Sequence, residues 1–322
     1  MRKNYKKIIF TALPIILGAF LIWYPLSKLN LSDFETIKNA FKTANYYWIF
    51  LSLFLGFLSH ASRAYRWKYL LEPLGYKPRF INSLLAVFAG YLVNFGIPRA
   101  GELTRAASIS KYENIPFEKA IGTIVAERVA DVFMLLLVIF FALFFQFELI
   151  WSLIQHRIPN NPIQLIIYFI SLLFFLLLLF MLLKKLKPTL FYKIKIIVKG
   201  LFEGGFSILK MKNKGSFIFH TILIWFLYIL TFYIASFALP ETSNLSMGAI
   251  LTGFIVGSLS IAATNGGIGT YPLGVQQALI LYGISSLPAL TFGWITWTAQ
   301  TLGIILFGGI SFLLLPIYNN KK

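Results

Sequence analysis

The 322-residue chain contains no cysteine, which excludes a disulfide framework, a thiol nucleophile and any metal site with cysteine ligands. Charged residues make up only 12% of the sequence, about half of the roughly 25% that is usual in a soluble domain. The three histidines lie far apart in the chain, so the sequence indicates no metal, no cofactor and no catalytic residue. Hydrophobic residues make up 58% of the sequence, which is the composition of a polytopic membrane protein.

The charged residues are mostly basic, with a net charge of +18. In a soluble chain this surplus would suggest nucleic acid, but here the basic residues lie between apolar segments, as is typical of membrane topology. Segment 184–214 is rich in lysine, whereas 147–162 holds a single arginine and 240–247 holds no basic residue. The positive-inside rule therefore predicts that both termini and the 184–214 loop are cytoplasmic, and we expect no nucleic-acid partner.

Apolar segments of the length that a spanning helix needs, roughly 20 residues, recur along the chain. Two further apolar stretches, about 80–98 and 247–264, instead end in glycine-rich breaks. Because 99–117 is too polar to face lipid, we expect a re-entrant hairpin that enters at 80–98 and returns through 100–113. The same count of membrane crossings predicts a second hairpin in 247–285, which enters from the opposite face of the membrane. Full spans are expected at about 8–27, 46–62, 118–146, 163–183, 216–239 and 288–316.

The two halves of the chain share the order span, hairpin, span. "GYLVNFGIPRAGELTR" (90–105) can be aligned with "GSLSIAATNGGIGTYP" (257–272). We therefore predict an all-α membrane fold of about six full helices and two opposed hairpins in a single transmembrane domain, with 46–146 repeated in inverted topology as 216–316. Inverted repeats recur in secondary transporters, whose sites lie where broken helices meet. The free N–H groups of half-helix starts suit an anion.

Ionisable residues within the apolar segments are expensive to place there and indicate function. Two interpretations remain open. The residues could form a structural salt-bridge cluster that locks the first hairpin to the following span. Alternatively, the arginines face a polar cavity and bind a phosphate, whose oxygens match the planar guanidinium group. The residues are Arg99, Glu102 and Arg105 in the hairpin and Glu127, Arg128 and Asp131 in the span.

Two weaker sets of candidates lie elsewhere. Arg63 and Arg66 end the second span, where such residues most often reach out to the headgroups beside an interfacial aromatic such as Trp67. The alternative is a role in a headgroup pathway. The second glycine-rich break offers further candidates for binding a substrate, of which the tyrosine is equally well explained by a structural role. These are Asn265, Gly266, Gly267, Gly269 and Tyr271.

Four short motifs follow one another in a familiar order: "RAYRW" (63–67), "PRAGELTR" (98–105), "AERVADV" (126–132) and "NGGIGTY" (265–271). In these motifs the chain resembles the transmembrane region of lysylphosphatidylglycerol synthases, which also occurs as stand-alone flippase-like membrane proteins. The resemblance covers about residues 10–315. It implies an integral protein of the bacterial cytoplasmic (inner) membrane.

In full-length members of that family, this region moves an aminoacylated phospholipid to the outer leaflet, and a separate soluble domain makes the lipid. We expect no such domain here, because the longest connection has only about 30 residues, too few for a domain. The chain is therefore expected not to be an enzyme. The family usually has an acidic residue after the second glycine-rich turn, whereas "TYPLGVQQ" (270–277) is uncharged. This difference argues against a strictly proton- or cation-coupled mechanism and against a lysyl headgroup.

The function predicted from the sequence is flippase-like translocation of a phospholipid or a polyprenyl-phosphate-linked lipid headgroup across the cytoplasmic membrane. One alternative is an intramembrane enzyme that modifies a lipid. The other is a scaffold that transports nothing and has the proteins of an envelope-synthesis complex as partners.

Overall fold

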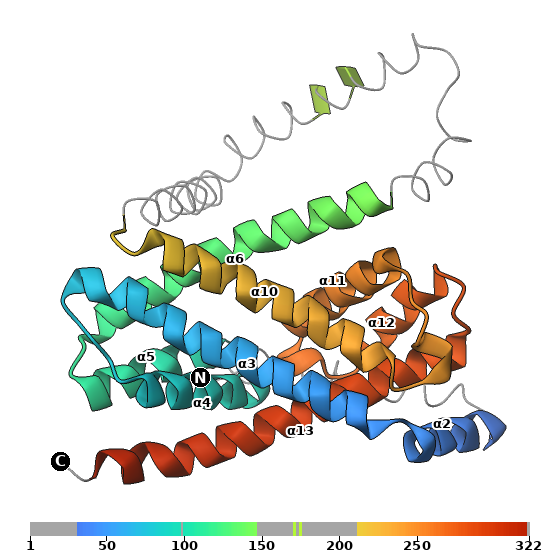
Figure 1. Cartoon of the computed structure of the whole chain (residues 1–322), viewed down its shortest axis with the longest axis horizontal. Coiled ribbons are helices and arrows are strands. Elements are labelled where there is room, and N and C mark those ends of the chain that lie inside the picture. Colours follow the sequence, from blue (N-terminus) through green and yellow to red (C-terminus); the bar gives the residue numbers. More distant parts are fainter. Residues whose placement is uncertain (1–30, 98, 147–169, 172–173, 176–210, 321–322) are drawn as a thin grey trace, which may run out of the picture. The chain divides into compact units, whose positions relative to one another are not determined.

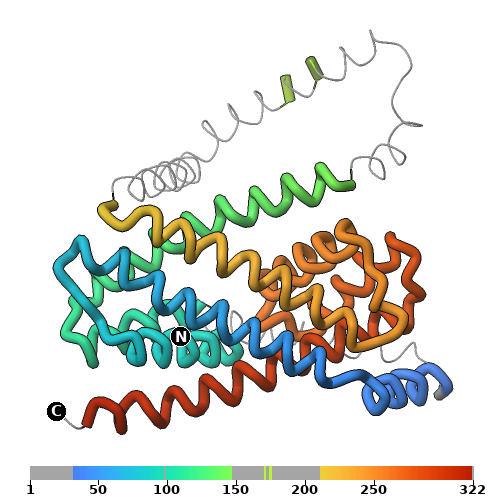
Figure 2. Tube along the Cα trace, in the orientation of Figure 1, coloured from blue at the N-terminus to red at the C-terminus, as the bar shows by residue number. Residues whose placement is uncertain are grey.

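In the residues that the computed structural model describes, every regular element is a helix (Figures 1 and 2). This confirms the all-α prediction. The span predicted at 8–27 lies outside the described residues, as do most of the span predicted at 163–183 and nearly all of the basic segment 184–214. The described residues are 31–97, 99–146, 170–171, 174–175 and 211–320.

The chain divides into two compact units. One unit comprises Met1–Ile139 and Lys212–Lys322, and the other comprises Phe140–Met211. Helix α6 (Phe117–Phe145) passes from the first unit into the second. All the contacts discussed below belong to the first unit.

Helices α3 (Tyr46–Leu71) and α10 (Lys214–Ser236) lie side by side in opposite directions (Figure 1). Hydroxyl groups line their contact. Ser52 Oγ donates a hydrogen bond of 3.0 Å to the Thr231 carbonyl oxygen. Small hydroxyl residues allow helices in membranes to approach closely and to bond across the contact.

Helices α4 (Phe80–Gly96) and α5 (Ala100–Glu113) form the first broken helix pair. They pack backbone to backbone, because a Cβ atom on Gly90 would lie only 2.7 Å from the carbonyl oxygen of Gly101. The Gly101 N–H at the start of α5 donates 2.7 Å to the side-chain oxygen of Asn94. This bond satisfies one of the N–H groups that a helix start leaves without a partner in its own helix.

Helices α11 (Met247–Ala263) and α12 (Thr270–Ile280) form the second broken helix pair, joined by a short 3₁₀ turn, η3 (Asn265–Gly267). A Cβ atom on Gly257 would lie 2.7 Å from the Tyr271 ring, so glycine again permits the close approach.

The breaks in the two pairs meet. Gly266 of η3 has a φ of 65° and lies directly against the ring of Phe95 at the end of α4. The carbonyl oxygen of Gly266 accepts a hydrogen bond of 2.8 Å from Trp297 Nε1. Two interruptions that lie far apart in the sequence are therefore packed against each other.

Helix α13 (Ser286–Asn319) packs against both α12 and α4. Along α4 the contact is tight, because a Cβ on Gly308 would lie 2.5 Å from the Leu92 Cβ. Among the described residues, α6, α10 and α13 are long and apolar enough to cross a membrane, while α4 and α11 are shorter apolar helices. The chain is thus a multi-pass membrane protein. The count of six spans, the re-entrant hairpins and the inverted repeat stay predictions.

A polar clasp joins the start of α4, the end of α5 and the end of α13. Arg79 Nε and Asn82 Nδ2 donate to the Glu113 carboxylate at 3.0 and 2.5 Å. Asn82 and Asn319 exchange amide hydrogen bonds of 3.0 and 2.9 Å, and Arg79 also donates to Asn319. The clasp therefore fixes the first broken helix pair to the last helix.

Candidate functional site

The charged residues of the first half converge on Glu127, a fully buried carboxylate of α6. Its two oxygens accept hydrogen bonds of 3.1 and 2.8 Å from Nη1 and Nη2 of Arg105. Arg63 Nη1 also donates to Glu127, and Arg66 Nη2 lies 3.2 Å away. One carboxylate of α6 thus contacts arginines from α3 and α5, and it joins the first broken helix pair to α3 and α6.

Asp131 lies one helical turn further along α6 and continues the network. It accepts bonds of 2.8 Å from Arg63 Nη1 and 3.1 Å from Arg66 Nη2. Arg128 Nη1 contacts the same carboxylate at 3.3 Å. The four-residue spacing of the carboxylates places them on one helix face, opposite two arginines that are three residues apart on α3.

Arg63 and Arg66 are only 3% and 0% exposed. The interpretation that they reach out to the headgroups is therefore wrong, because the carboxylates of α6 hold them inside the protein. Helix α10 completes their surroundings. Arg66 Nη1 donates 2.8 Å to Thr221 Oγ1, and Arg63 Nη2 donates 3.3 Å to Tyr228 Oη.

Trp67 is fully buried and supports Arg105 rather than lying in an interfacial belt, as the sequence had suggested. The guanidinium carbon of Arg105 is 3.9 Å from the centre of the Trp67 ring, a cation–π contact. Trp67 Nε1 donates 2.9 Å to Thr123 Oγ1. The indole is thereby held at both its face and its edge.

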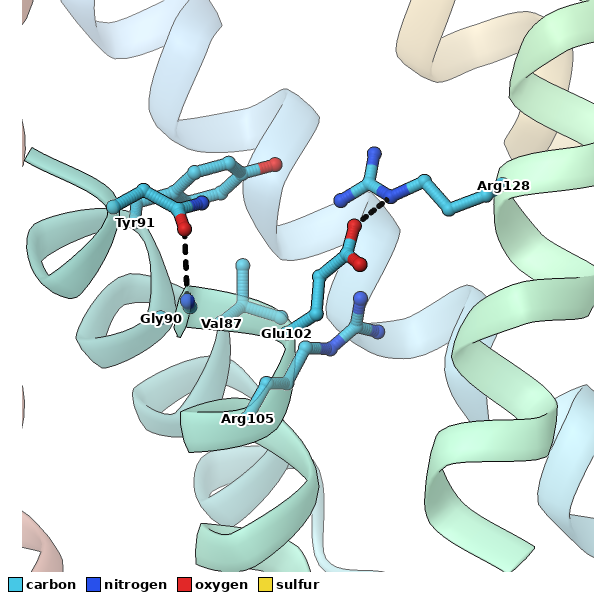
Figure 3. A pocket seen from close by; sticks show the side chains of 8 residues that line it. Val87, Gly90, Tyr91, Glu102, Arg105 and Arg128 are labelled. Carbon is cyan, nitrogen blue, oxygen red and sulfur yellow. Dashed lines mark hydrogen bonds and ion pairs between the residues drawn. The ribbon is translucent and has the colours of Figure 1, made fainter. Parts of the chain in front are cut away.

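The half-exposed edge of the network is the pair formed by Arg128 and Glu102. Arg128 Nε lies 2.6 Å from Glu102 Oε1, and the two side chains are 41% and 40% exposed. Figure 3 shows them pointing toward each other from α6 and α5, with Arg105 beside them. They border a pocket lined by Val87, Gly90, Tyr91, Asn94, Gly101, Glu102, Arg105 and Arg128.

The charged residues form one arginine–carboxylate cluster with two parts. Its buried part links helices through Glu127 and Asp131, and its exposed part faces a pocket through Arg128 and Glu102. The seven members are Arg63, Arg66, Arg105, Arg128, Glu102, Glu127 and Asp131.

Arg99 does not join this cluster. It is exposed, immediately precedes α5, and forms no ion pair with any described residue. Its φ of 62° is unusual for a residue with a side chain. Of the six charged candidates of the hairpin and the following span, five are brought together and Arg99 is left apart.

The candidate residues of the second half of the chain lie at the break between α11 and α12. Asn265 is 5% exposed and Tyr271 is 3% exposed, and the three candidate glycines, Gly266, Gly267 and Gly269, have φ values of 65°, 75° and 71°. Conformations of this kind favour glycine. From 247 to 280 the sequence holds no acidic or basic residue, so the second broken helix pair is formally uncharged.

Several neutral residues of the site were not predicted. Tyr228 and Thr221 contact the buried arginines from α10, while Tyr91 and Asn94 line the pocket. A signal existed for the first two, because they lie seven residues apart and share one face of an apolar helix. Nothing in the local sequence distinguishes Tyr91 from the other tyrosines of the chain.

Comparison with known proteins gives one family. The family described as "Lysylphosphatidylglycerol synthase TM region" matches residues 11–309. The chain is also similar to a UPF0104 membrane protein of Methanocaldococcus jannaschii, with 37% identity over 100 residues. That similarity covers 30% of this chain and 29% of the relative, so the aligned part spans less than a third of the relative's length. No solved structure matches the chain.

Proposed function

Because the chain belongs to the lysylphosphatidylglycerol synthase TM-region family, we propose that it moves a lipid headgroup between the leaflets of the cytoplasmic membrane. The substrate would be a phospholipid or a polyprenyl-phosphate-linked lipid. The observation that carries this proposal is the pocket bordered by Arg128, Glu102 and Arg105, beside a network of buried ion pairs.

In this proposal Arg128 receives the phosphate. Its guanidinium group presents several N–H donors in one plane, which suits two phosphate oxygens at once. One of those donors, Arg128 Nε, now donates a hydrogen bond to the Glu102 carboxylate. Since both side chains are about two-fifths exposed, the pair is weakly held, and an arriving phosphate can displace the carboxylate.

The buried part of the cluster holds the binding group in position. Asp131 contacts Arg128 from one turn away, and Glu127 holds Arg105 by two hydrogen bonds. A buried ion pair contributes little net stability, yet it orders the groups that it joins. Its role here is to keep the two arginines of the pocket at fixed positions.

The packed breaks would provide the passage for the headgroup. Irregular backbone at membrane depth is tolerated where it is buried in protein or lines a wet cavity. The contact between Gly266 and Phe95 brings the second broken helix pair beside the α4 helix that lines the pocket. We further propose that both termini are cytoplasmic, in keeping with the distribution of basic residues.

The proposal is tested in proteoliposomes that contain the purified chain and a fluorescent phosphatidylglycerol. A membrane-impermeant reductant then measures how much of the label has reached the outer leaflet. The chain should accelerate exchange between leaflets, and Arg128→Lys should slow it while leaving expression unchanged, because lysine keeps the charge but loses the planar donors. Arg99→Lys is the matched control, since Arg99 lies outside the cluster.

The same assay separates the rival functions. A chemically altered lipid without exchange would indicate a lipid-modifying enzyme. Neither exchange nor chemical change would indicate a scaffold, and envelope-synthesis proteins would then be its partners.

A further inference from the structure

We propose that the pocket selects a headgroup with a single phosphodiester negative charge and no cationic group. This inference rests on the proposed function and specifies its substrate class. It comes from the balance of charge in the arginine–carboxylate cluster and from the chemistry of the second break.

The cluster has an unbalanced positive charge. It contains four guanidinium groups and three carboxylates, all joined by the contacts described above. One positive charge therefore remains. In an environment of low dielectric constant an uncompensated charge is costly, and one added negative charge would balance it. A phosphodiester carries one such charge.

The buried arginines also have unused donors. The Nε atoms of Arg63, Arg66 and Arg105 are buried and have no hydrogen-bond partner in the described part of the chain. Buried polar groups normally find partners. Of the three, Arg105 lines the pocket, so an anion bound there would bring acceptor oxygens close to a guanidinium group that still has a donor free.

The two buried carboxylates of the cluster, Glu127 and Asp131, are not available for a cation. Glu127 contacts three arginines, Asp131 contacts three, and Glu102 contacts Arg128. An ammonium that took Glu127 or Asp131 would leave arginines uncompensated. One that took Glu102, once the phosphate has displaced it, would cancel the charge of the phosphodiester and leave the positive surplus of the cluster unbalanced. The cationic headgroup of an aminoacylated lipid would also add to the existing positive surplus, so the charge balance disfavours it.

The second break offers only neutral partners. Asn265 Nδ2 in the break is a buried donor without a partner among the described residues, and so is Trp294 Nε1 on α13. The Trp294 ring lies against Trp297, whose Nε1 donates to Gly266 of the break. The helices on either side of the break carry no formal charge. Such donors suit hydroxyl or carbonyl oxygens. Phe95, one turn beyond the pocket residue Tyr91 on α4, touches Gly266 of this break. The phosphodiester would thus bind the arginines, and the uncharged remainder of the headgroup would extend toward Asn265.

Lipid binding tests the proposal separately from transport. The full chain in nanodiscs is offered equal amounts of phosphatidylglycerol, phosphatidylcholine and lysylphosphatidylglycerol, and the bound lipids are measured by native mass spectrometry. We expect phosphatidylglycerol to be preferred over each of the others by about tenfold or more, because phosphatidylcholine brings one additional positive charge and the lysyl lipid two into a site of low dielectric constant. Equal binding, or preference for the lysyl lipid, would overturn the proposal.

Three variants vary the surplus charge. Arg128→Gln removes the surplus and should abolish the preference for phosphatidylglycerol, whereas Glu102→Gln raises it and should strengthen the preference. The double variant Arg128→Gln/Glu102→Gln restores a surplus of one. It should bind less lipid in total, because Arg128 is lost, but it should recover most of the preference for phosphatidylglycerol over the other two lipids. If the double variant shows no more preference among the three lipids than Arg128→Gln alone, the charge balance does not set the selectivity and the proposal is overturned. The melting temperature of each variant, measured in parallel, identifies any that is misfolded.

Three further outcomes distinguish this inference from the proposed transport function and from the binding of a soluble anion. Selective binding without exchange in proteoliposomes would support the inference and contradict the proposed function. Exchange of all three lipids at equal rates, with equal binding, would support transport and overturn the charge selection. Displacement of bound lipid by inorganic phosphate at comparable concentration would assign the site to a soluble anion and overturn the lipid assignment.

Discussion

Arg105 and Glu127 form a two-point ion pair in which each terminal guanidinium nitrogen of Arg105 meets a different oxygen of Glu127, at 3.1 and 2.8 Å. The pair is almost fully buried, with side-chain exposures of 5% and 0%. It joins α5 to α6 and, because Glu127 also contacts α3, it makes three helices depend on one carboxylate. That dependence gives the first prediction.

Glu127→Gln should destabilise the protein severely. The amide keeps the shape of the side chain but removes the charge that compensates Arg63, Arg66 and Arg105. Removing one partner of a buried pair costs about 3–5 kcal/mol. We therefore expect lower abundance in membranes and a lower melting temperature in detergent. Any loss of transport should follow the loss of protein.

Glu118→Gln is the matched control, because Glu118 is an exposed residue in the first turn of the same helix. It should change the melting temperature little. If Glu127→Gln and Glu118→Gln prove equally stable, Glu127 does not hold the buried network together.

Arg99→Gly should leave stability unchanged or raise it by about 1 kcal/mol, because glycine adopts a positive φ without the steric cost that arginine bears. Arg99→Ala should not gain this stability, since alanine keeps the Cβ atom. Melting temperatures of the two variants measure the difference. Both variants lack the guanidinium group, so equal loss of transport in both, at normal stability, would return Arg99 to the binding site.

Gly101→Ala should destabilise the first broken helix pair by about 1–3 kcal/mol, as overpacking typically does. The added Cβ would collide with the carbonyl oxygen of Gly90 and would lie 2.7 Å from the Asn94 side chain. Backbone atoms cannot move aside as a flexible side chain can. Gly96→Ala is the control, because a Cβ atom there meets nothing within 4 Å. Comparable melting temperatures for the two variants would contradict the packing described here.

The predicted topology is tested at the two ends of α10. The chain has no native cysteine, so single cysteines can be placed at the exposed positions Lys214 and Glu241. An impermeant thiol reagent applied to intact cells should label the Glu241→Cys variant and spare Lys214→Cys until the membrane is opened. The reverse pattern would invert the assignment of both termini.

The sequence indicated the two broken helix pairs correctly as sites of irregular backbone, because glycine-rich segments and local charge are visible without long-range information. It placed the end of the second span at 62, whereas α3 continues to Leu71. The difference arises from Arg63 and Arg66, whose charges seemed to require water. Their partners lie more than 60 residues away on α6, and no local pattern reveals that pairing.

Helix α2 (Leu31–Thr43) was not predicted. It lies between the spans predicted at 8–27 and 46–62, and its mixed composition offers no apolar segment of spanning length. An indication was present, because Asp33 lies in its first turn and Lys42 in its last, which complements the helix dipole. Within the site, Glu127 holds Arg105 and Asp131 contacts Arg128. The sequence leaves open which carboxylate holds which arginine, because the choice between carboxylates one turn apart depends on how α5 packs against α6.

The polar clasp also has a consequence for biosynthesis. Arg79 and its partner Asn319 are separated by 240 residues. At roughly 5–20 residues per second, a ribosome needs on the order of ten to fifty seconds to make the intervening chain. During that interval the first broken helix pair lacks Asn319, and Glu113 within the pair is the clasp partner that Arg79 and Asn82 already have. A helix pair from the first third of the chain therefore completes its polar contacts only when the last helix has been made.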